Sequence, residues 1–153
     1  MIKTMKTRIL ILAGIIVTLF LYSFSFRIAD SYSLTVEVEN LRNEKGIVQF
    51  ALYNKDGTFP DEHYKKYYKI GKSEIMNGVA TYTFSGLPAG MYAVNILHDE
   101  NENRKIDRGL LFPKEGIGFS NYQSIGLRNK PNFRKASFEL KGDLKINVKV
   151  IYM

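Results

Sequence analysis

Hydrophobic and polar residues alternate along much of the chain after its N-terminal segment, and this period of two predicts β-strands. Leu34, Val36 and Val38 alternate with polar neighbours, which predicts a strand with one buried and one exposed face. A more apolar strand is predicted at 47–53, after a polar turn that ends at Gly46. We expect these two strands to form a hairpin, because only a short polar turn separates them.

The middle of the chain predicts a second hairpin and a central strand. Segments 70–76 and 79–84 are separated by Asn77 and Gly78, a residue pair that favours a two-residue turn with positive φ. Segment 91–97 is apolar at both alternating sets of positions, which is typical of a strand covered on both faces. This strand is therefore expected at the centre of a sheet.

The remaining segments are less regular. Residues 61–69 predict one or two helical turns, because Pro60 stands at the favoured start of a helix. The stretch 98–134 has no clear period, and loops of that length are usually functional or disordered. We expect order there, because the stretch carries several aromatic residues and glycines. Two further strands are predicted at 135–140 and 143–152.

Several short strands, mostly joined by short turns, predict an all-β fold. The expected architecture is an antiparallel immunoglobulin-like or transthyretin-like β-sandwich, formed by a single domain at residues 32–153. We expect an N-terminal hydrophobic helix, a signal peptide or membrane anchor, to precede this domain.

The N-terminal segment, residues 1–31, has the pattern of an export signal. Lys3, Lys6 and Arg8 precede an uncharged run at 9–26. That run is longer than the roughly 7–15 apolar residues of a cleaved signal and close to the roughly 20 that span a bilayer. The protein is therefore predicted in the periplasm or at the cell surface. If the segment is not cleaved, the protein would be anchored in the inner membrane and would contact lipid only through residues 9–26.

Charge and cysteine content narrow the class of protein. The net charge of +7 includes four basic residues of the N-terminal segment, and the excess over the rest of the chain is mild and scattered. Together with predicted export, this excludes nucleic acid as an expected partner. The chain has no cysteine, so its core must be stable without disulfides or be helped by a metal.

An acidic, amide-rich segment follows the predicted central strand. Oxygen-bearing side chains stand at the first, third, fifth and ninth positions of this segment, the alternate spacing with which EF-hand-type loops supply hard oxygens to calcium. Arg104 stands where such loops prefer glycine, and Leu110 where they carry a bidentate glutamate. Another oxygen can complete the shell only if the chain folds back. The predicted ligands are Asp99, Asn101, Asn103, the Lys105 carbonyl, Asp107 and Glu115.

Two alternatives stand beside calcium. The segment can be a solvated turn in which Asx side chains cap local backbone amides. Asp99, Asp107 or Glu115 can also act as the paired carboxylates of a periplasmic hydrolase, which requires a fixed separation in a cleft. His98 next to Asp99 is expected to be hydrogen-bonded to the long loop, because no catalytic motif accompanies it.

A second candidate site lies in the predicted helical turns. Tyr64, Tyr67 and Tyr68 alternate with lysines, a pattern that suits an aromatic and basic surface for glycans or anionic lipid headgroups. The alternative is that one or two of these tyrosines cover the end of the sandwich while the lysines are solvated.

The sequence resembles an exported bacterial family known as domain of unknown function 2141. The resemblance is carried by a glycine-containing hairpin near the start and by three segments, LPAGMYAVNILHDENENRKID, PKEGIGFSN and PNFRKASF. It implies a transthyretin-like or prealbumin-like β-sandwich with no established activity. Members of the family generally carry glycine at the position of Arg104.

The sequence thus favours an exported, non-catalytic binding or scaffold module with a calcium-stabilised acidic loop. Its expected partner is an envelope protein or a glycan. A membrane-tethered structural subunit of an envelope complex is the second hypothesis, and the periplasmic hydrolase is the third.

Overall fold

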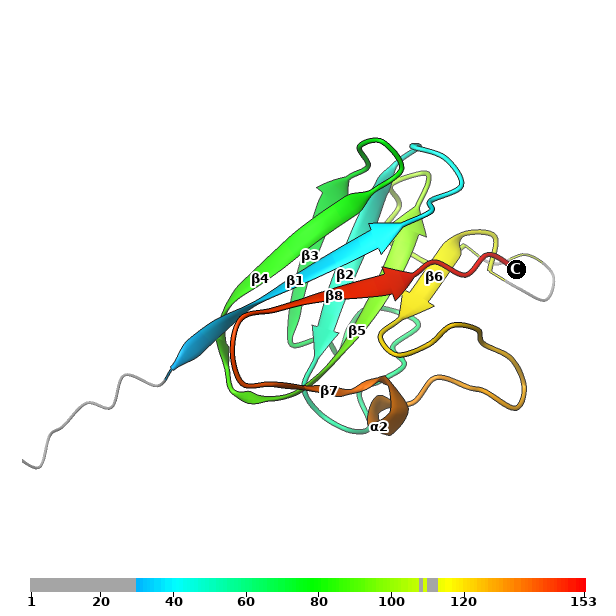
Figure 1. Cartoon of the computed structure of the whole chain (residues 1–153). Helices are drawn as coiled ribbons and strands as arrows, with labels where there is room; N and C mark the ends of the chain where they lie inside the picture. Colours follow the sequence, from blue (N-terminus) through cyan, green and yellow to red (C-terminus); the bar gives the residue numbers. More distant parts are fainter. Residues whose placement is uncertain (1–29, 108, 110–112) are drawn as a thin grey trace, which may run out of the picture.

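The computed structural model describes residues 30–107, 109 and 113–153, so the predicted signal or anchor before Asp30 and the position of Leu110 lie outside the described residues. The described chain is an all-β sandwich of two sheets (Figure 1). One sheet has the order β4-β1-β8, and the other has the order β3-β2-β5-β6, with β7 paired to β5. The elements are β1 (Ser31–Glu39), β2 (Ile47–Tyr53), β3 (Lys69–Glu74), β4 (Ala80–Pro88), β5 (Gly90–Asp99), β6 (Gly116–Phe119), α2 (Phe133–Ala136), β7 (Phe138–Leu140) and β8 (Leu144–Lys149).

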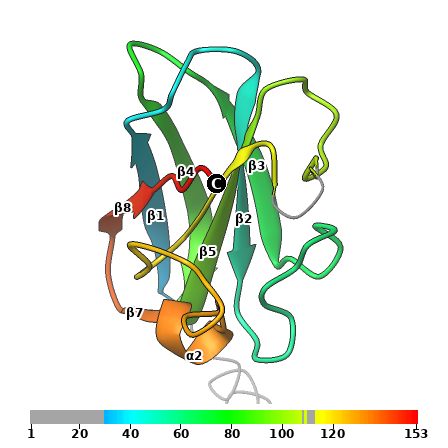
Figure 2. The same cartoon turned by 90° about the vertical axis from the view of Figure 1, so that its right-hand side faces the viewer.

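Two hydrophobic cores stabilise the fold. The inner core lies between the sheets and includes the predicted apolar face of β1, which is fully buried. The outer core covers the other face of the β2–β5–β6 sheet and lies beneath residues 54–68 and 120–134 (Figure 2). β5 is buried on both faces, as its sequence predicted, because it lies between these two cores. The buried members of the outer core are Ala51, Tyr53, Phe59, Tyr64, Ala93, Leu97, Ile117, Phe119, Tyr122 and Ala136.

The prediction that the first two strands pair with each other is wrong. β1 pairs antiparallel with β4 and parallel with β8, whereas β2 pairs with β3 and β5. Residues 40–46 therefore carry the chain from one sheet to the other. β2 is buried along its whole length, so it occupies a central position with a neighbour on each side.

The predicted turn at Asn77 and Gly78 is confirmed, but the strands on either side of it do not pair as a hairpin. Both residues have positive φ, 54° and 74°, and Met76 and Val79 form an antiparallel bridge across them. Beyond this single bridge, β3 and β4 belong to different sheets.

The predicted helical turns at 61–69 are also wrong. The carboxylate of Asp61 accepts hydrogen bonds from the backbone N–H groups of His63, Lys65 and Lys66. In a helix these N–H groups would donate to backbone carbonyls; here they donate to the Asp61 side chain, so the segment forms irregular turns. The next strand, β3, begins at Lys69.

The C-terminal third is more structured than its sequence indicated. The stretch 98–134 contains β6, and the predicted strand at 135–140 begins instead with the short helix α2. Asn132 caps this helix by accepting a hydrogen bond from the Lys135 N–H. Of the residues described, none belongs to a helix with the length and hydropathy that a membrane span requires.

Candidate functional site

The acidic loop, described at residues 99–107 and 113–115, connects β5 to β6 at one end of the sandwich (Figure 2). Its anchor is Asp99, the last residue of β5, which is fully buried. The Asp99 carboxylate accepts hydrogen bonds from the backbone N–H groups of Asn103, at 3.1 Å, and Arg104, at 2.7 Å. The carboxylate therefore closes the first turn of the loop onto the end of the strand.

The polar side chains of the loop then point toward one another. The side-chain amides of Asn101 and Asn103 donate to the Asp107 carboxylate at 2.6 and 2.9 Å. Arg104 has a φ of 62°, so the backbone adopts the left-handed conformation that favours glycine at this position. The loop curls tightly even though the residue here is arginine.

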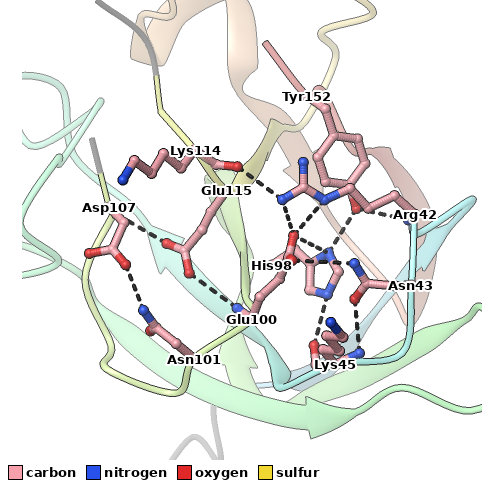
Figure 3. A network of polar contacts seen from close by, with 10 residues as sticks. All are labelled: Arg42, Asn43, Lys45, His98, Glu100, Asn101, Asp107, Lys114, Glu115 and Tyr152. Atoms are coloured by element: carbon pink, nitrogen blue, oxygen red, sulfur yellow. Dashed lines mark hydrogen bonds and ion pairs between the residues drawn. The ribbon is translucent and has the colours of Figure 1, made fainter. Parts of the chain in front are cut away.

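Glu115 completes the loop by folding back over it (Figure 3). Its carboxylate accepts from the backbone N–H groups of Glu100, at 3.1 Å, and Asp107, at 3.0 Å. The Lys114 N–H donates to the Asp107 carbonyl at 2.8 Å, which closes the same connection from the backbone. The return of the chain that a complete oxygen shell requires is thus present.

The described residues do not form a carboxylate cage. They contain no group of three or more His, Cys, Asp or Glu residues placed to hold a metal ion together. The structure brings Asn101 and Asn103 to Asp107, whereas Asp99 and Glu115 each bind backbone amides of the loop. Any cation here would have to draw on amide and carbonyl oxygens as well as carboxylates.

The loop is braced by residues that sequence reasoning did not single out. The Arg42 guanidinium forms an ion pair with Glu100, donates to the Lys114 carbonyl at 3.0 Å and lies over the Tyr152 ring at 4.7 Å (Figure 3). Burial opposes ionisation of Glu100, but hydrogen bonds from Asn43 and Arg42 outweigh it and lower the pKa of this carboxyl. No local signal marks this brace, because Arg42 and Glu100 are distant in sequence.

Gly46 brings the connection between the sheets against the acidic loop. Its φ is +70°, and a Cβ built on it would overlap the Asp99 carbonyl oxygen and lie 2.8 Å from the Glu100 carbonyl carbon and Cα. Only glycine allows the two backbones to approach this closely.

His98 has a structural position. Its side chain is fully buried, with Nε2 3.0 Å from the Lys45 carbonyl and Nδ1 2.8 Å from the Tyr152 hydroxyl. A carbonyl can only accept, so Nε2 donates the proton of the bond to Lys45. Both hydrogen bonds go to Lys45 and the C-terminal segment, and the long loop approaches the ring only through the Glu100 carboxylate, 3.9 Å from Nδ1. Both ring nitrogens are engaged in hydrogen bonds within the protein, so neither is free to act as a general base in a pair with Asp99.

The three tyrosines of the second candidate site differ in their exposure to solvent. Tyr64 lies buried in the outer core, so it is not part of an accessible surface. Tyr67 and Tyr68 are each 40% exposed, and the Tyr68 ring packs 6.2 Å from that of Tyr92. A binding role of the two exposed tyrosines stays a prediction.

Stability of the cation-free protein is expected to depend on Glu115 in the acid range. Burial, reinforced by the charges of Asp99 and Asp107, raises the pKa of Glu115. The folded state then holds this proton more tightly than the unfolded chain does. The resulting stabilisation is complete below the unfolded pKa and is lost as pH rises through the folded pKa.

NMR titration of the Glu115 carboxyl carbon in chelator would measure this shift directly. Urea unfolding of the wild type and of Glu115→Gln, between about pH 4 and 7, would measure the linked change in stability. The free-energy difference between the two proteins should vary with pH. A titration midpoint at or below the ordinary value for glutamate would contradict this prediction.

Comparison with known proteins identifies a family. The family model described as "Uncharacterized protein conserved in bacteria (DUF2141)" matches residues 36–147. No curated protein matches this chain. A solved structure of a fimbrial assembly protein from Parabacteroides distasonis is similar at 10% sequence identity and a TM-score of 0.40, over 82% of this chain and 53% of that one. The chain thus spans about half the length of that protein. Because the family model extends from β1 into β8, the chain belongs to this family of uncharacterized bacterial proteins.

Proposed function

We propose that this protein is an exported, non-catalytic binding or scaffold module whose acidic loop is stiffened by a calcium ion. The observation that carries the calcium proposal is the return of Glu115 over the loop, because its carboxylate accepts from the Glu100 and Asp107 N–H groups and so brings the end of the loop back to its start. The left-handed backbone at Arg104 supports it, since calcium loops need a sharp turn at this position.

The oxygens that would hold the ion come from the predicted set. Asp99, Asp107 and Glu115 would supply charge, and Asn101, Asn103 and the Lys105 carbonyl would supply neutral oxygens. In the structure the Asn101 and Asn103 amides donate to Asp107, and the described carboxylates do not converge. Binding therefore requires the amide oxygens to turn inward and the carboxylates to draw together. This rearrangement and the small number of carboxylates favour weak affinity, of the order of 10⁻⁴–10⁻³ M, as in extracellular calcium modules.

A non-catalytic role is supported by how the carboxylates are used. Asp99 and Glu115 both accept hydrogen bonds from backbone amides that hold the loop together. General acid or base catalysis would need a carboxylate free to exchange a proton with a substrate. These two side chains serve the shape of the loop, which suits a stable surface for contact with a partner.

Calcium is expected to raise the melting temperature. With a dissociation constant of about 1 mM, 10 mM calcium would add about 1.4 kcal/mol to the free energy of unfolding, or roughly 4–8 °C. Differential scanning fluorimetry with calcium, with magnesium and with chelator would measure this shift. Magnesium should have a smaller effect, because it demands a stricter octahedral shell.

Two variants locate the ion. Asp107→Asn should lose most of the calcium response, whereas Glu102→Gln should keep it, because Glu102 is an exposed carboxylate of the same loop outside the predicted set. An unchanged wild-type midpoint at 10 mM calcium would refute the calcium proposal. Equal responses of the two variants would place the ion elsewhere.

A further inference from the structure

Four buried polar atoms on the outer side of the larger sheet form no hydrogen bond of normal length and angle within the described structure. They are Gln49 Nε2, Tyr53 OH, Tyr64 OH and Asn95 Oδ1. Asn95 is only 2% exposed. Polar atoms buried in this way are costly, since they lose water without gaining a protein partner, and each calls for an explanation.

These groups belong to one neighbourhood. Asn95 on β5 stands opposite Ala51 on β2, and Gln49 and Tyr53 flank Ala51 on the same face of that strand. Burial raises the pKa of both Tyr53 and Tyr64 and the nearby Asp61 charge reinforces the rise, whereas an interaction of each hydroxyl with the Asn95 side chain opposes it. Both hydroxyls therefore keep their protons at physiological pH.

Asn95 also lines an apolar pocket of about 190 Å³. Phe119, its partner in the register of β5 with β6, lies beside it in the lining. The walls come from β6 and from the surrounding loops, and they consist mainly of Ile106, Ile117, Ile125 and three prolines. Of the described residues, the charged ones that line the pocket are Asp61 and Glu62, and none is basic.

We infer that this pocket binds a small, neutral, single-ring molecule that carries a hydroxyl group. The volume suits one ring, because an apolar cavity of about 150 Å³ holds benzene, whereas drug-sized ligands need roughly 300 Å³ or more. The hydroxyl would donate to Asn95 Oδ1, because Asn95 is the residue among these four that lines the pocket. An anionic ligand is disfavoured, because the lining charges are acidic. The inference goes beyond the proposed function, since no residue of the predicted calcium set lines the pocket.

Phenol, toluene and benzoate are suitable probes, because they share a ring and differ in the polar group. Titration of the ¹⁵N-labelled protein, followed by ¹H–¹⁵N correlation spectra, should give saturable shifts for phenol at the amides of Asn95, Ile117 and Phe119. Toluene should bind about five- to tenfold more weakly, which is the effect of one hydrogen bond to a buried acceptor. Benzoate should cause no saturable shift.

Matched variants test the role of Asn95. Asn95→Leu keeps the size of the side chain and removes the acceptor, so it should abolish the preference for phenol over toluene. Leu127→Ala should leave both affinities unchanged, because Leu127 is 91% exposed in the neighbouring loop and does not line the pocket.

Several results would overturn the inference. These are the absence of saturable shifts with phenol up to its solubility limit, equal affinities for phenol and toluene in the wild type, and an unchanged preference in Asn95→Leu. The first result would mean that ordered water alone satisfies the buried polar atoms. If Asn95→Leu fails to fold, the comparison of phenol with toluene in the wild type still decides.

Discussion

Replacing Gly46 with alanine is expected to lower the free energy of unfolding by about 2–5 kcal/mol. Part of the cost is backbone strain, because a φ of +70° costs a residue with a Cβ about 1–2 kcal/mol. The larger part is steric, because the new methyl group would overlap the carbonyl oxygen of Asp99. Backbone cannot move aside as a flexible side chain can, so overpacking here adds about 1–3 kcal/mol.

A second glycine separates these two contributions. Gly78 has a φ of +74°, but a Cβ there would meet no atom within 4 Å. Gly78→Ala should therefore cost only the strain, about 1–2 kcal/mol. Urea unfolding of both variants would measure the difference. If the two variants lose the same stability, the contact between Gly46 and the acidic loop is looser than the structure indicates.

Asp99→Ala is expected to cost about 1–3 kcal/mol in the absence of calcium. The substitution removes the carboxylate to which the Asn103 and Arg104 N–H groups donate. The Asn103 N–H keeps its bond to Asn101 Oδ1, so the cost comes mainly from the Arg104 amide, which loses its partner. The variant should also lose its thermal response to calcium. Chemical denaturation in chelator and fluorimetry in calcium would measure these two effects separately.

Asp56 provides the matched control for Asp99. Its carboxylate accepts a hydrogen bond from the Gly57 N–H, but both residues are exposed, so water can replace the lost bond. Asp56→Ala should cost about 1 kcal/mol or less. A cost for Asp99→Ala no larger than that of Asp56→Ala would show that the acidic loop keeps its shape without its buried anchor.

The sequence predicted individual strands better than it predicted their partners. The apolar run at 47–53 coincides with β2, because polar residues bound it on both sides. Its pairing was wrong, because a polar turn such as 40–46 can close a hairpin or cross between sheets with the same residues. Burial of both faces of β2 decides between a hairpin and a crossing, and that burial depends on strands distant in sequence.

The candidate site shows the same limit. Spacing alone identified the oxygen-rich side chains after β5 and marked Arg104 as the position where such loops prefer glycine. That the backbone is left-handed there comes from the structure. It could not identify Arg42 or Tyr152 as the brace, because ion pairs and ring contacts between remote segments leave no periodic signal. The sequence leaves open which of the three tyrosines covers the sandwich, because all of them have lysine neighbours. The turns built around Asp61 direct Tyr64 into the outer core.

The parallel pairing of β1 with β8 also decides how the domain responds to tension. The ladder runs from Leu34 opposite Leu144 to Glu39 opposite Lys149, so β1 begins at one end of the sandwich and β8 finishes toward the other (Figure 1). A pull between Ser31 and Lys149 would slide the two strands past each other along their length. The hydrogen bonds between them would then carry the load together, whereas a pull across the open end of a hairpin breaks them one after another. The domain is therefore built to resist shear along this axis more strongly than peeling across it.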